Sequence, residues 1–390
     1  MKFNLDIRFY NTFNLAQPLL DYLLIELDNR GYKTKAYVSK WKYRNSNKGH
    51  DQIKHFEQAW LTQFSSFHKR FNQVGYCVAA FFKLLFTSPK LNVFFTQPPL
   101  FIIFGAWVSR IKGIQYGIHA MDLYPDLVGA LGYLKEDGWL YKWMDKSMIK
   151  AMRRAEFVTV LGRCMEEYLL AKGIPQAKMN TVFNVPSISD SGKTSDFLAK
   201  EGLADKFTVL YAGNMGVAHE FDTLLKVISE FESSYPDIHF LIVGKGFRRK
   251  EVESYIEKEQ PSNLKLFGYL ENEEFEAILK DTDVHFISLR DDFNGLMVPS
   301  KLYSSLALSK PIIFEGSRKN EISLAMAEFG FGVHLPHNDF NGLKKTILGY
   351  KNDREALANA SANAKVYFDT QCNVSEIINE YSQFLINQLS

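Results

Sequence analysis

The sequence predicts an α/β protein of two doubly wound domains, each a parallel sheet with helices on both faces. Its 390 residues fit roughly two to three domains at about 150 residues each. Short β-rich runs alternate with longer helical stretches in both halves. Several runs are apolar at consecutive positions, as strands buried on both faces are. With 46% hydrophobic and 23% charged residues, the chain is neither disordered nor of low complexity.

Strands are expected in the first half at residues 3–9, 35–38, 92–96, 115–119, 157–161 and 180–184, and in the second half at 207–212, 240–243, 264–267, 284–289, 311–314 and 332–335. Between the halves, residues 185–206 are rich in Ser, Asp and Gly, which predicts an inter-domain linker. The chain then divides into an N-terminal domain at 1–184, a C-terminal domain at 207–371 and a final helix at about 372–390. Open α/β sheets bind ligands at the carboxyl ends of their strands, so we expect a ligand cleft between the domains.

Three glycine turns at expected strand ends predict a phosphate and nucleotide site in the C-terminal domain. Glycine lets backbone N–H groups approach an oxyanion, and a following helix adds partial positive charge. Basic side chains open the helix after the second turn, where acids are usual, and the third turn could bond a flat base. The candidate residues are Gly213, Asn214, Gly216, His219, Gly244, Lys245, Gly246, Arg248, Phe267, Gly268 and Tyr269. The alternative is three tight connections without a ligand.

The stretch that follows the strand at 284–289 carries the most specific pattern. A glycine-containing loop leads to the sequence V-P-S-K, which predicts a helix start because Pro suits a first helical turn and Ser suits a cap. A lysine at such a start suits an anion. The candidate residues are Asn294, Gly295, Val298, Pro299, Ser300, Lys301, Tyr303 and Ser304.

Taken in order, these motifs resemble the GT-B glycosyltransferases, and within them the bacterial surface-polysaccharide enzymes of glycosyltransferase family 4. The motifs are FTQPP at 95–99, MDLYPD at 121–126, VLGRCMEEYL at 160–169 followed by Asn184, AGNMG at 212–216, VGKG at 243–246, LFGYL at 266–270 and VPSKLYSSLALSKPII at 298–313. The resemblance implies two Rossmann-like domains, with the final helix crossing back onto the first. It implies a UDP- or GDP-sugar donor in the C-terminal domain, an acceptor over the N-terminal domain, and transfer with retention, in polysaccharide or glycoconjugate assembly.

The chain departs from that family pattern at several positions. The second Glu of the family's Glu-x7-Glu motif falls at Ser304, and the first has no acidic match, since Asn294 or the loop at 295–297 stands there. Asn214, with Val217 and His219 after it, occupies the place where many members have Arg and Lys. Lys301 and Lys245 are the replacement cations. The N-terminal Gly-Gly loop is also absent, with Asn-Thr-Phe-Asn at 11–14.

The candidate catalytic residues are Asp122, His119 and Lys301. Asp122 at the end of GIHAMD would orient the acceptor hydroxyl, and His119 would contact sugar or phosphate. A turn former and a core histidine are the respective alternatives. No metal or cofactor is expected. The Asp281-Thr282-Asp283 pattern precedes a strand, whereas the metal-binding Asp-x-Asp of GT-A transferases follows one, so we interpret it as a helix-terminus turn.

A basic region near the N-terminus predicts an anionic partner. Between residues 30 and 90, 12 Lys and Arg stand against 2 acids, although the whole chain carries only +2. Phe56, Trp60, Phe64, Phe67 and Phe71 recur at helical spacing and predict a helix that could lie on an anionic membrane. A core-facing stripe is the alternative, and no nucleic-acid-binding motif accompanies the charge.

The expected location is cytoplasmic, with peripheral contact to the inner face of the cell membrane. The three cysteines are far apart and form no C-x-x-C motif, which favours a reducing compartment. A signal-peptide core and an apolar run of about 20 residues are both missing. Two alternative functions stay open: a nucleotide-sugar epimerase of the same fold, and a non-catalytic partner of another transferase.

Overall fold

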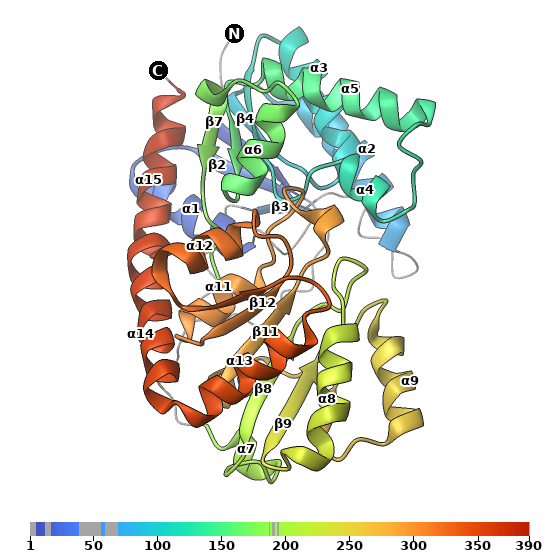
Figure 1. The fold of residues 1–390 in the computed structure, drawn as a ribbon. Coiled ribbons are helices and arrows are strands. Elements are labelled where there is room, and N and C mark those ends of the chain that lie inside the picture. Colours follow the sequence, from blue (N-terminus) through green and yellow to red (C-terminus); the bar gives the residue numbers. More distant parts are fainter. Residues whose placement is uncertain are drawn as a thin grey trace. The chain divides into compact units, whose positions relative to one another are not determined.

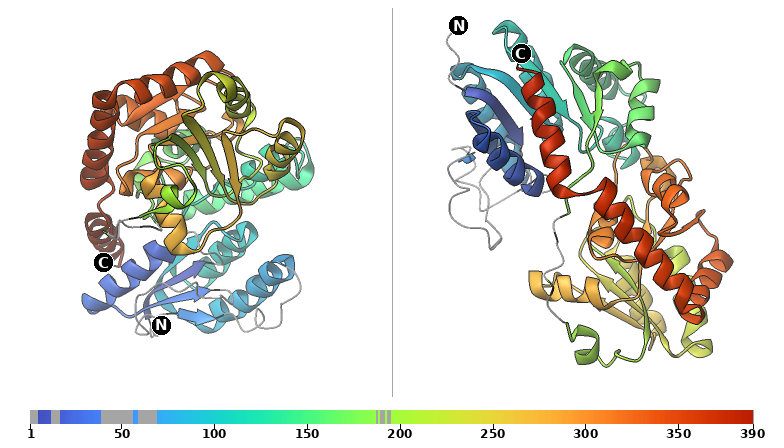
Figure 2. Two further views of the ribbon diagram at one scale, coloured as in Figure 1. Left: turned by 90° about the horizontal axis from the view of Figure 1, so that it is seen from below. Right: turned by 90° about the vertical axis from the view of Figure 1, so that its left-hand side faces the viewer.

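The computed structural model describes residues 5–11, 17–38, 56–58, 69–186, 188, 192 and 195–389. It divides into two compact units. Unit 1 consists of Met1–Val185, Gly295–Met297 and Val374–Ser390, and unit 2 of Pro186–Asn294 and Val298–Asn373. Each unit is a parallel sheet with helices on both faces, so the α/β fold class predicted from the sequence is confirmed (Figures 1 and 2).

Unit 1 contains a seven-stranded sheet in the order β3-β2-β1-β4-β5-β6-β7, and all of its pairs are parallel. Its strands are β1 (Leu5–Asn11), β2 (Thr34–Val38), β3 (Phe56–Gln58), β4 (Pro89–Phe95), β5 (Gln115–His119), β6 (Val158–Val160) and β7 (Met179–Thr181). Its helices are α1 (Gln17–Asn29), α2 (Lys69–Phe86), α3 (Pro99–Ile111), α4 (Asp126–Ala130), α5 (Trp139–Arg154), α6 (Arg163–Ala171), the 3₁₀ turn η4 (Gln176–Lys178) and α15 (Val374–Asn387). Right-handed crossovers place α1 on one face of this sheet and α2, α3 and α5 on the other.

Unit 2 contains a six-stranded parallel sheet in the order β10-β9-β8-β11-β12-β13. Its strands are β8 (Phe207–Ala212), β9 (Ile238–Val243), β10 (Leu264–Phe267), β11 (Val284–Ser288), β12 (Ile312–Glu315) and β13 (Gly332–Leu335). Its helices are α7 (Phe197–Lys200), α8 (Asp222–Ser234), α9 (Arg249–Glu259), α10 (Asn272–Asp281), the 3₁₀ turn η5 (Asp291–Phe293), α11 (Lys301–Ala307), α12 (Glu321–Phe329), α13 (Phe340–Asn352) and α14 (Arg354–Gln371).

Strand β8 shows why these strands are apolar at consecutive positions. Val209 and Tyr211 belong to one buried cluster with α8, whereas Leu210 and Ala212 belong to a second cluster that includes α10 residues. Successive side chains of a strand point to opposite faces, so burial on both faces requires apolar residues throughout. The strand ends, which have no such requirement, carry the polar residues described below.

The final helix α15 packs within unit 1. Arg30, just after α1, donates to Asn379 at 2.5 Å and to Gln383 at 3.2 Å. Tyr381, on the same helix, is buried and lies 3.0 Å from His119 at the end of β5. Among the residues that the structure describes, no helix combines the length and apolar character needed to cross a membrane.

Two expectations about local structure are corrected. The aromatic stripe at 56–71 is not one helix, because Phe56–Gln58 is strand β3, paired in parallel with β2, and the helix begins only at Lys69. Trp60, Phe64 and Phe67 lie outside the described residues. The expected linker at 185–206 contains helix α7, whose Leu198 packs into the core of unit 2, so this part of it is structural.

Candidate functional site

Two glycine turns meet at the carboxyl edge of the unit 2 sheet. They follow the neighbouring strands β8 and β9, and the N–H of Met215 in the first turn donates to Lys245 O in the second at 2.9 Å. A Cβ on Gly244 would lie 1.9 Å from Gly213 O, and one on Gly246 would lie 2.3 Å from Met215 O. Glycine is therefore required here so that one turn can pack against the other.

This role differs from the one expected for two of the glycines. The N–H of Gly213 donates to Val243 O at 2.9 Å, and the N–H of Gly244 donates to Phe267 O at 3.3 Å. Both donors continue the strand pairing, so neither is free for an oxyanion. The glycines shape the edge of the sheet, and cationic side chains are left to provide positive charge there.

Replacing Gly244 with alanine is expected to lower the free energy of unfolding by about 3 kcal/mol or more. The φ of Gly244 is +144°, which strains any L-residue, and the added methyl group would collide with the backbone of Gly213. Urea unfolding measures the change. Gly349→Ala is the control, because a Cβ there meets nothing within 4 Å in helix α13. That substitution should be neutral or stabilising, and equal effects of the two would contradict the crowding argument.

Lys301 reaches into the space beside the first turn. Its Nζ lies 3.2 Å from Asn214 O, 3.0 Å from Nε2 of His219 and 4.8 Å from the ring centroid of Tyr211. A Cβ on Gly213 would be 3.2 Å from its Cε, so the turn also leaves room for the lysine side chain. Desolvation lowers the pKa of Lys301 to about 7, and no carboxylate ion pair with it is found in the described part of the chain.

His219 holds Lys301 in position as a neutral imidazole. Burial, together with the Lys301 charge, lowers the pKa of His219 to about 3. Its Nδ1 lies 2.5 Å from the carbonyl oxygen of Ser288, so Nδ1 carries the proton and donates. Nε2 then presents a lone pair, which accepts from the Lys301 ammonium. The result is an amino group whose direction is fixed before any ligand arrives.

The basic residues in and after the second glycine turn differ in what they contact. Lys245 is exposed, and its Nζ lies 5.2 Å from the ring centroid of Tyr269, which is itself 61% exposed. Arg248 donates to Glu251 at 3.0 Å in the first turn of α9. Arg249 instead bonds the carbonyl oxygens of Gly244 and Phe267, both at 2.6 Å, and so ties the ends of β9 and β10 together.

The two helices that follow these turns begin differently from what the motifs suggest. Helix α8 begins at Asp222, three residues after His219, and Ser300 precedes α11 without the expected side-chain capping bond. Among the remaining candidates, Gly216, Gly268 and Ser304 are half-buried, whereas Val298, Pro299 and Tyr303 are buried. Phe267 packs edge-on against Phe197. The side chain of Asn294 accepts a hydrogen bond from Asn320 at 3.3 Å. Gly295 is grouped with unit 1, where a Cβ would meet Cys164 O at 2.9 Å.

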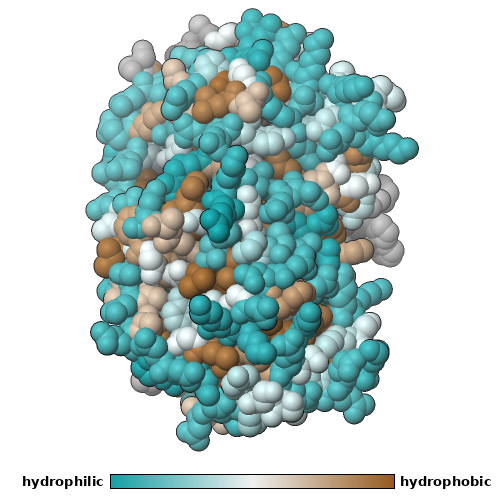
Figure 3. All heavy atoms as spheres, in the orientation of Figure 1, coloured by the Kyte–Doolittle hydropathy of each residue, from teal (hydrophilic) through white to brown (hydrophobic). Residues whose placement is uncertain are grey.

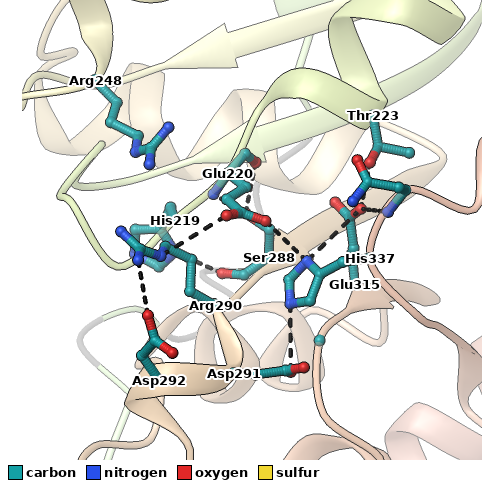
Figure 4. Close-up of polar contacts among 12 residues, drawn as sticks. His219, Glu220, Thr223, Arg248, Ser288, Arg290, Asp291, Asp292, Glu315 and His337 are labelled. Atoms are coloured by element: carbon teal, nitrogen blue, oxygen red, sulfur yellow. Dashed lines mark hydrogen bonds and ion pairs between the residues drawn. The ribbon is translucent and has the colours of Figure 1, made fainter. Parts of the chain in front are cut away.

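A cluster of carboxylates around His337 was not predicted from the sequence (Figure 4). Nδ1 of His337 lies 2.9 Å from Glu220 and 3.9 Å from Glu315, and Nε2 lies 3.4 Å from Asp291. We call these four residues the His337 cluster. They come from four separate segments: the loop before α8, the end of β12, η5 and the loop after β13.

Glu315 is the buried member of the His337 cluster, with 1% of its surface exposed. Its Oε1 accepts from the hydroxyl of Thr223 and from the N–H of Asn338 at 3.1 Å, and burial raises its pKa. Ser288 links the cluster to the Lys301–His219 pair. The carbonyl oxygen of Ser288 accepts from His219, and its hydroxyl accepts from the N–H of Glu220. The one sign of this cluster in the sequence was the acidic Glu315 at the end of the apolar run IIFE.

The structure separates the two candidates at the carboxyl edge of unit 1. His119 is fully buried, stacks on Phe95 at 4.6 Å and lies 3.0 Å from the Tyr381 hydroxyl, and burial lowers its pKa to about 3. It is a core residue and not the expected ligand contact. Asp122 accepts from Gln97 at 2.7 Å, and burial raises its pKa to about 6.

The Asp281 and Asp283 carboxylates each bond protein groups. Asp281 accepts from the hydroxyl of Ser195 at 2.8 Å, and Asp283 accepts from the N–H and hydroxyl of Thr208 at 2.8 and 2.9 Å. Asp281 ends helix α10, in keeping with the helix-terminus interpretation. Asp291 and Asp292 belong to η5, where Asp292 pairs with Arg290 at 2.8 Å.

The carboxyl edge of the unit 2 sheet lies within a segment that matches a known protein family. Residues 194–367 match the family described as "Glycosyl transferases group 1". The "Probable glycosyltransferase WbjE" of Pseudomonas aeruginosa is 26% identical over 261 residues, which is 65% of this chain and 64% of that protein. The chain thus spans less than two thirds of the curated relatives it matches. Residues 194–367 are thus similar to the glycosyltransferase group 1 family, and 65% of the chain is similar to a curated protein named as a probable glycosyltransferase.

Solved structures show the same fold over the whole chain. Sucrose-phosphate synthase from Thermosynechococcus elongatus aligns with a TM-score of 0.75 at 14% identity and covers 99% of both chains. Anabaena HepE in complex with UDP-glucose aligns with a TM-score of 0.72 at 14% identity, over 98% of this chain and all of that one. The two parallel-sheet units therefore form the GT-B fold.

Proposed function

We propose that this chain is a group 1 glycosyltransferase that moves a sugar from a nucleoside-diphosphate sugar to a hydroxyl group of a glycan or lipid-linked acceptor, with retention of configuration. The observation that carries the proposal is the Lys301–His219 pair beside the converging glycine turns, within the family match at 194–367. A UDP-sugar is our first choice of donor, since UDP-glucose is bound in the HepE complex, and a GDP-sugar is the second.

In this proposal Lys301 neutralises the leaving diphosphate. Negative charge grows on the diphosphate as the glycosidic bond breaks, and a cation already fixed in direction stabilises it without reorganisation. His219 supplies that direction, because its neutral Nε2 accepts from Lys301. Lys245 and Arg248, which border the same pair of turns, would add charge from the second strand end. These side chains, and not a divalent ion, are the proposed source of positive charge.

The His337 cluster is our candidate for binding the hydroxyl groups of the transferred sugar. Carboxylates accept hydrogen bonds from hydroxyls, and Glu220 and Glu315 supply acceptors next to the Lys301–His219 pair. The cluster would thus supply carboxylates to a chain in which the first Glu of the family pattern has no acidic match.

Asp122 is our candidate for orienting the acceptor hydroxyl. The departing phosphate would take the proton of that hydroxyl. A carboxylate whose pKa is about 6 is ionised at neutral pH and still basic enough to hold a hydroxyl proton strongly. A lipid-linked acceptor would require the chain to work at a bilayer surface.

A nucleotide panel tests the proposal. Thermal unfolding is measured with UDP, GDP, ADP and TDP, each with a chelator present. A nucleotide at about 100 times its Kd stabilises the native state by about 2.7 kcal/mol, which shifts the Tm by several degrees. We expect a shift with UDP or, failing that, with GDP. No shift with any of the four, or a shift only without the chelator, would count against this donor site.

Product analysis separates transfer from the alternatives. With donor and an acceptor mixture, a transferase gives glycosylated acceptor and free nucleotide, whereas an epimerase converts the donor without an acceptor. A non-catalytic partner binds nucleotide and gives neither product, so binding without turnover would overturn the assigned reaction but not the binding site.

A further inference from the structure

Two neighbouring strands of unit 1 end in turns that are bonded to each other. Phe95, the last residue of β4, pairs with His119, the last residue of β5, so the residues that follow them lie side by side. The face drawn in Figure 3 is mainly hydrophilic, so a polar residue is informative chiefly where the fold has withdrawn it from water. Thr96 and Gln97, which follow β4, are such residues, since Thr96 is buried and Gln97 is half-buried.

Thr96 fixes the main chain of the turn after β5. Its hydroxyl oxygen accepts from the N–H of Met121 at 3.0 Å and from the N–H of Asp122 at 3.1 Å. Its own N–H donates to the carbonyl oxygen of His119 at 3.2 Å, which continues the pairing of the two strands. The backbone position of Asp122 is therefore set without any contribution from the side chain of Gln97.

The side chain of Gln97 instead fixes the carboxylate of Asp122. Nε2 of Gln97 donates to Oδ2 of Asp122 at 2.7 Å, and the Gln97 side chain also hydrogen-bonds the hydroxyl group of Tyr124. Within the described part of the chain, no other hydrogen bond or ion pair to this carboxylate is found. One carboxylate oxygen is thus held by the protein, and Oδ1 is left to accept from another donor.

We propose that Gln97 is a positioning residue for Asp122, whose Oδ2 it holds so that Oδ1 accepts from the acceptor hydroxyl. This inference rests on the proposed function, in which Asp122 orients that hydroxyl, and it adds the residue that gives the carboxylate its direction. A neutral amide suits this task. A lysine or arginine at the same place would lower the pKa of Asp122 and make the carboxylate a weaker acceptor.

The titratable groups around this carboxylate leave Gln97 as the neighbour that supports its ionised form. Burial raises the pKa of Asp122 to about 6, and the hydrogen bond from Gln97 acts in the opposite direction. Tyr124, on the same loop, keeps its proton, because burial and the Asp122 charge raise the pKa of its hydroxyl group. His119 is neutral, because burial lowers its pKa to about 3. Removing the Gln97 amide should therefore raise the pKa of Asp122 by about one further pH unit.

The pH profile of Gln97→Met tests this role, because methionine keeps the length of the side chain and has no N–H to donate. In the wild-type chain, kcat/KM should fall as the pH drops through about 6. In the variant this acid limb should move upward by about one pH unit, which lowers kcat/KM at pH 6 about fivefold more than at pH 8. Gln97→Lys should move the limb the other way. A limb that stays at about pH 6 in both variants would overturn the proposal.

Gln176→Met is the matched control. Nε2 of Gln176 donates to Oε1 of Glu166 at 3.3 Å in an exposed hydrogen bond, also in unit 1. The same substitution there removes an amide donor from a carboxylate that the proposal does not use. It should leave kcat and the acid limb unchanged, and the nucleotide-induced Tm shift should persist in all of these variants. An equal movement of the limb in Gln176→Met would contradict a specific role for Gln97.

Thermal unfolding separates this inference from the proposed reaction, because it requires no turnover. Gln97→Met should lower the Tm more at pH 8, where Asp122 is ionised, than at pH 5, where it is protonated. In an Asp122→Asn background the loss should be the same at both pH values. Equal losses in the wild-type background would show that Gln97 only fills its place, and would overturn its role even if sugar transfer occurs. The expected pattern without any turnover would instead count against the proposed reaction.

Discussion

Replacing Lys301 with alanine is expected to lower kcat about 100- to 1,000-fold and to remove the Tm shift caused by the donor nucleotide. The loss corresponds to about 3–4 kcal/mol of transition-state stabilisation, the usual effect of deleting one preorganised donor to a developing anion. The change leaves His219 with its bond to Ser288, so the local fold should persist. Lys319→Ala is the control, since Lys319 is exposed on the same unit. A Lys301→Ala variant that still responds to nucleotide would remove Lys301 from the site.

The pH dependence of nucleotide binding follows from the same side chain. Desolvation lowers the pKa of Lys301 to about 7, so the free chain has lost most of this proton by pH 8. A diphosphate favours the ammonium form, so binding above pH 7 takes up a proton and the Kd rises with pH. Calorimetry in two buffers of different ionisation enthalpy measures the uptake. In Lys301→Ala this uptake should disappear.

Most of the fold could be predicted because each sheet is buried on both faces. Runs such as FLIV in β9 are apolar throughout, and this signal needs no knowledge of tertiary contacts. Strand β3 has only three residues, FEQ, and lacks the signal. It pairs with β2, and its Glu57 bonds the buried Arg8 of β1 at 2.9 Å. Such a strand depends on residues 49 positions away, which local periodicity does not reveal.

Site residues could be predicted where they belong to one short sequence motif. They could not be predicted where the site joins elements that are far apart in the chain. Lys301 belongs to a short motif at a helix start, and the structure brings it to the glycine turns. His337 and Glu315 are joined only because β12 and β13 are adjacent strands. His119 was misjudged for the converse reason: it ends a strand, which suggests a ligand position, but Tyr381 on the last helix covers it. Both facts depend on packing between segments far apart in the chain.

Replacing Asp122 with asparagine is expected to lower kcat about 100-fold or more while the nucleotide-induced Tm shift remains. The amide keeps the shape and can still bond Gln97, but it carries no negative charge to hold the acceptor proton. In the wild-type chain, kcat/KM should fall as the pH drops through about 6, because the raised pKa of Asp122 makes it protonate there. The variant should lack this step. A variant with normal kcat would show that Asp122 only shapes its turn.

Stability gives an independent check on the same carboxylate. Burial raises its pKa from 3.8 to about 6, so the ionised group is less favourable in the folded chain than in the unfolded one. Its contribution to stability is complete below pH 3.8 and is lost as the pH rises through 6. Asp122→Asn should therefore have a higher Tm than the wild type at pH 7, and the difference should shrink by pH 5. If Asp122 lowers stability at neutral pH and is also needed for turnover at that pH, then the active site requires it and the fold does not.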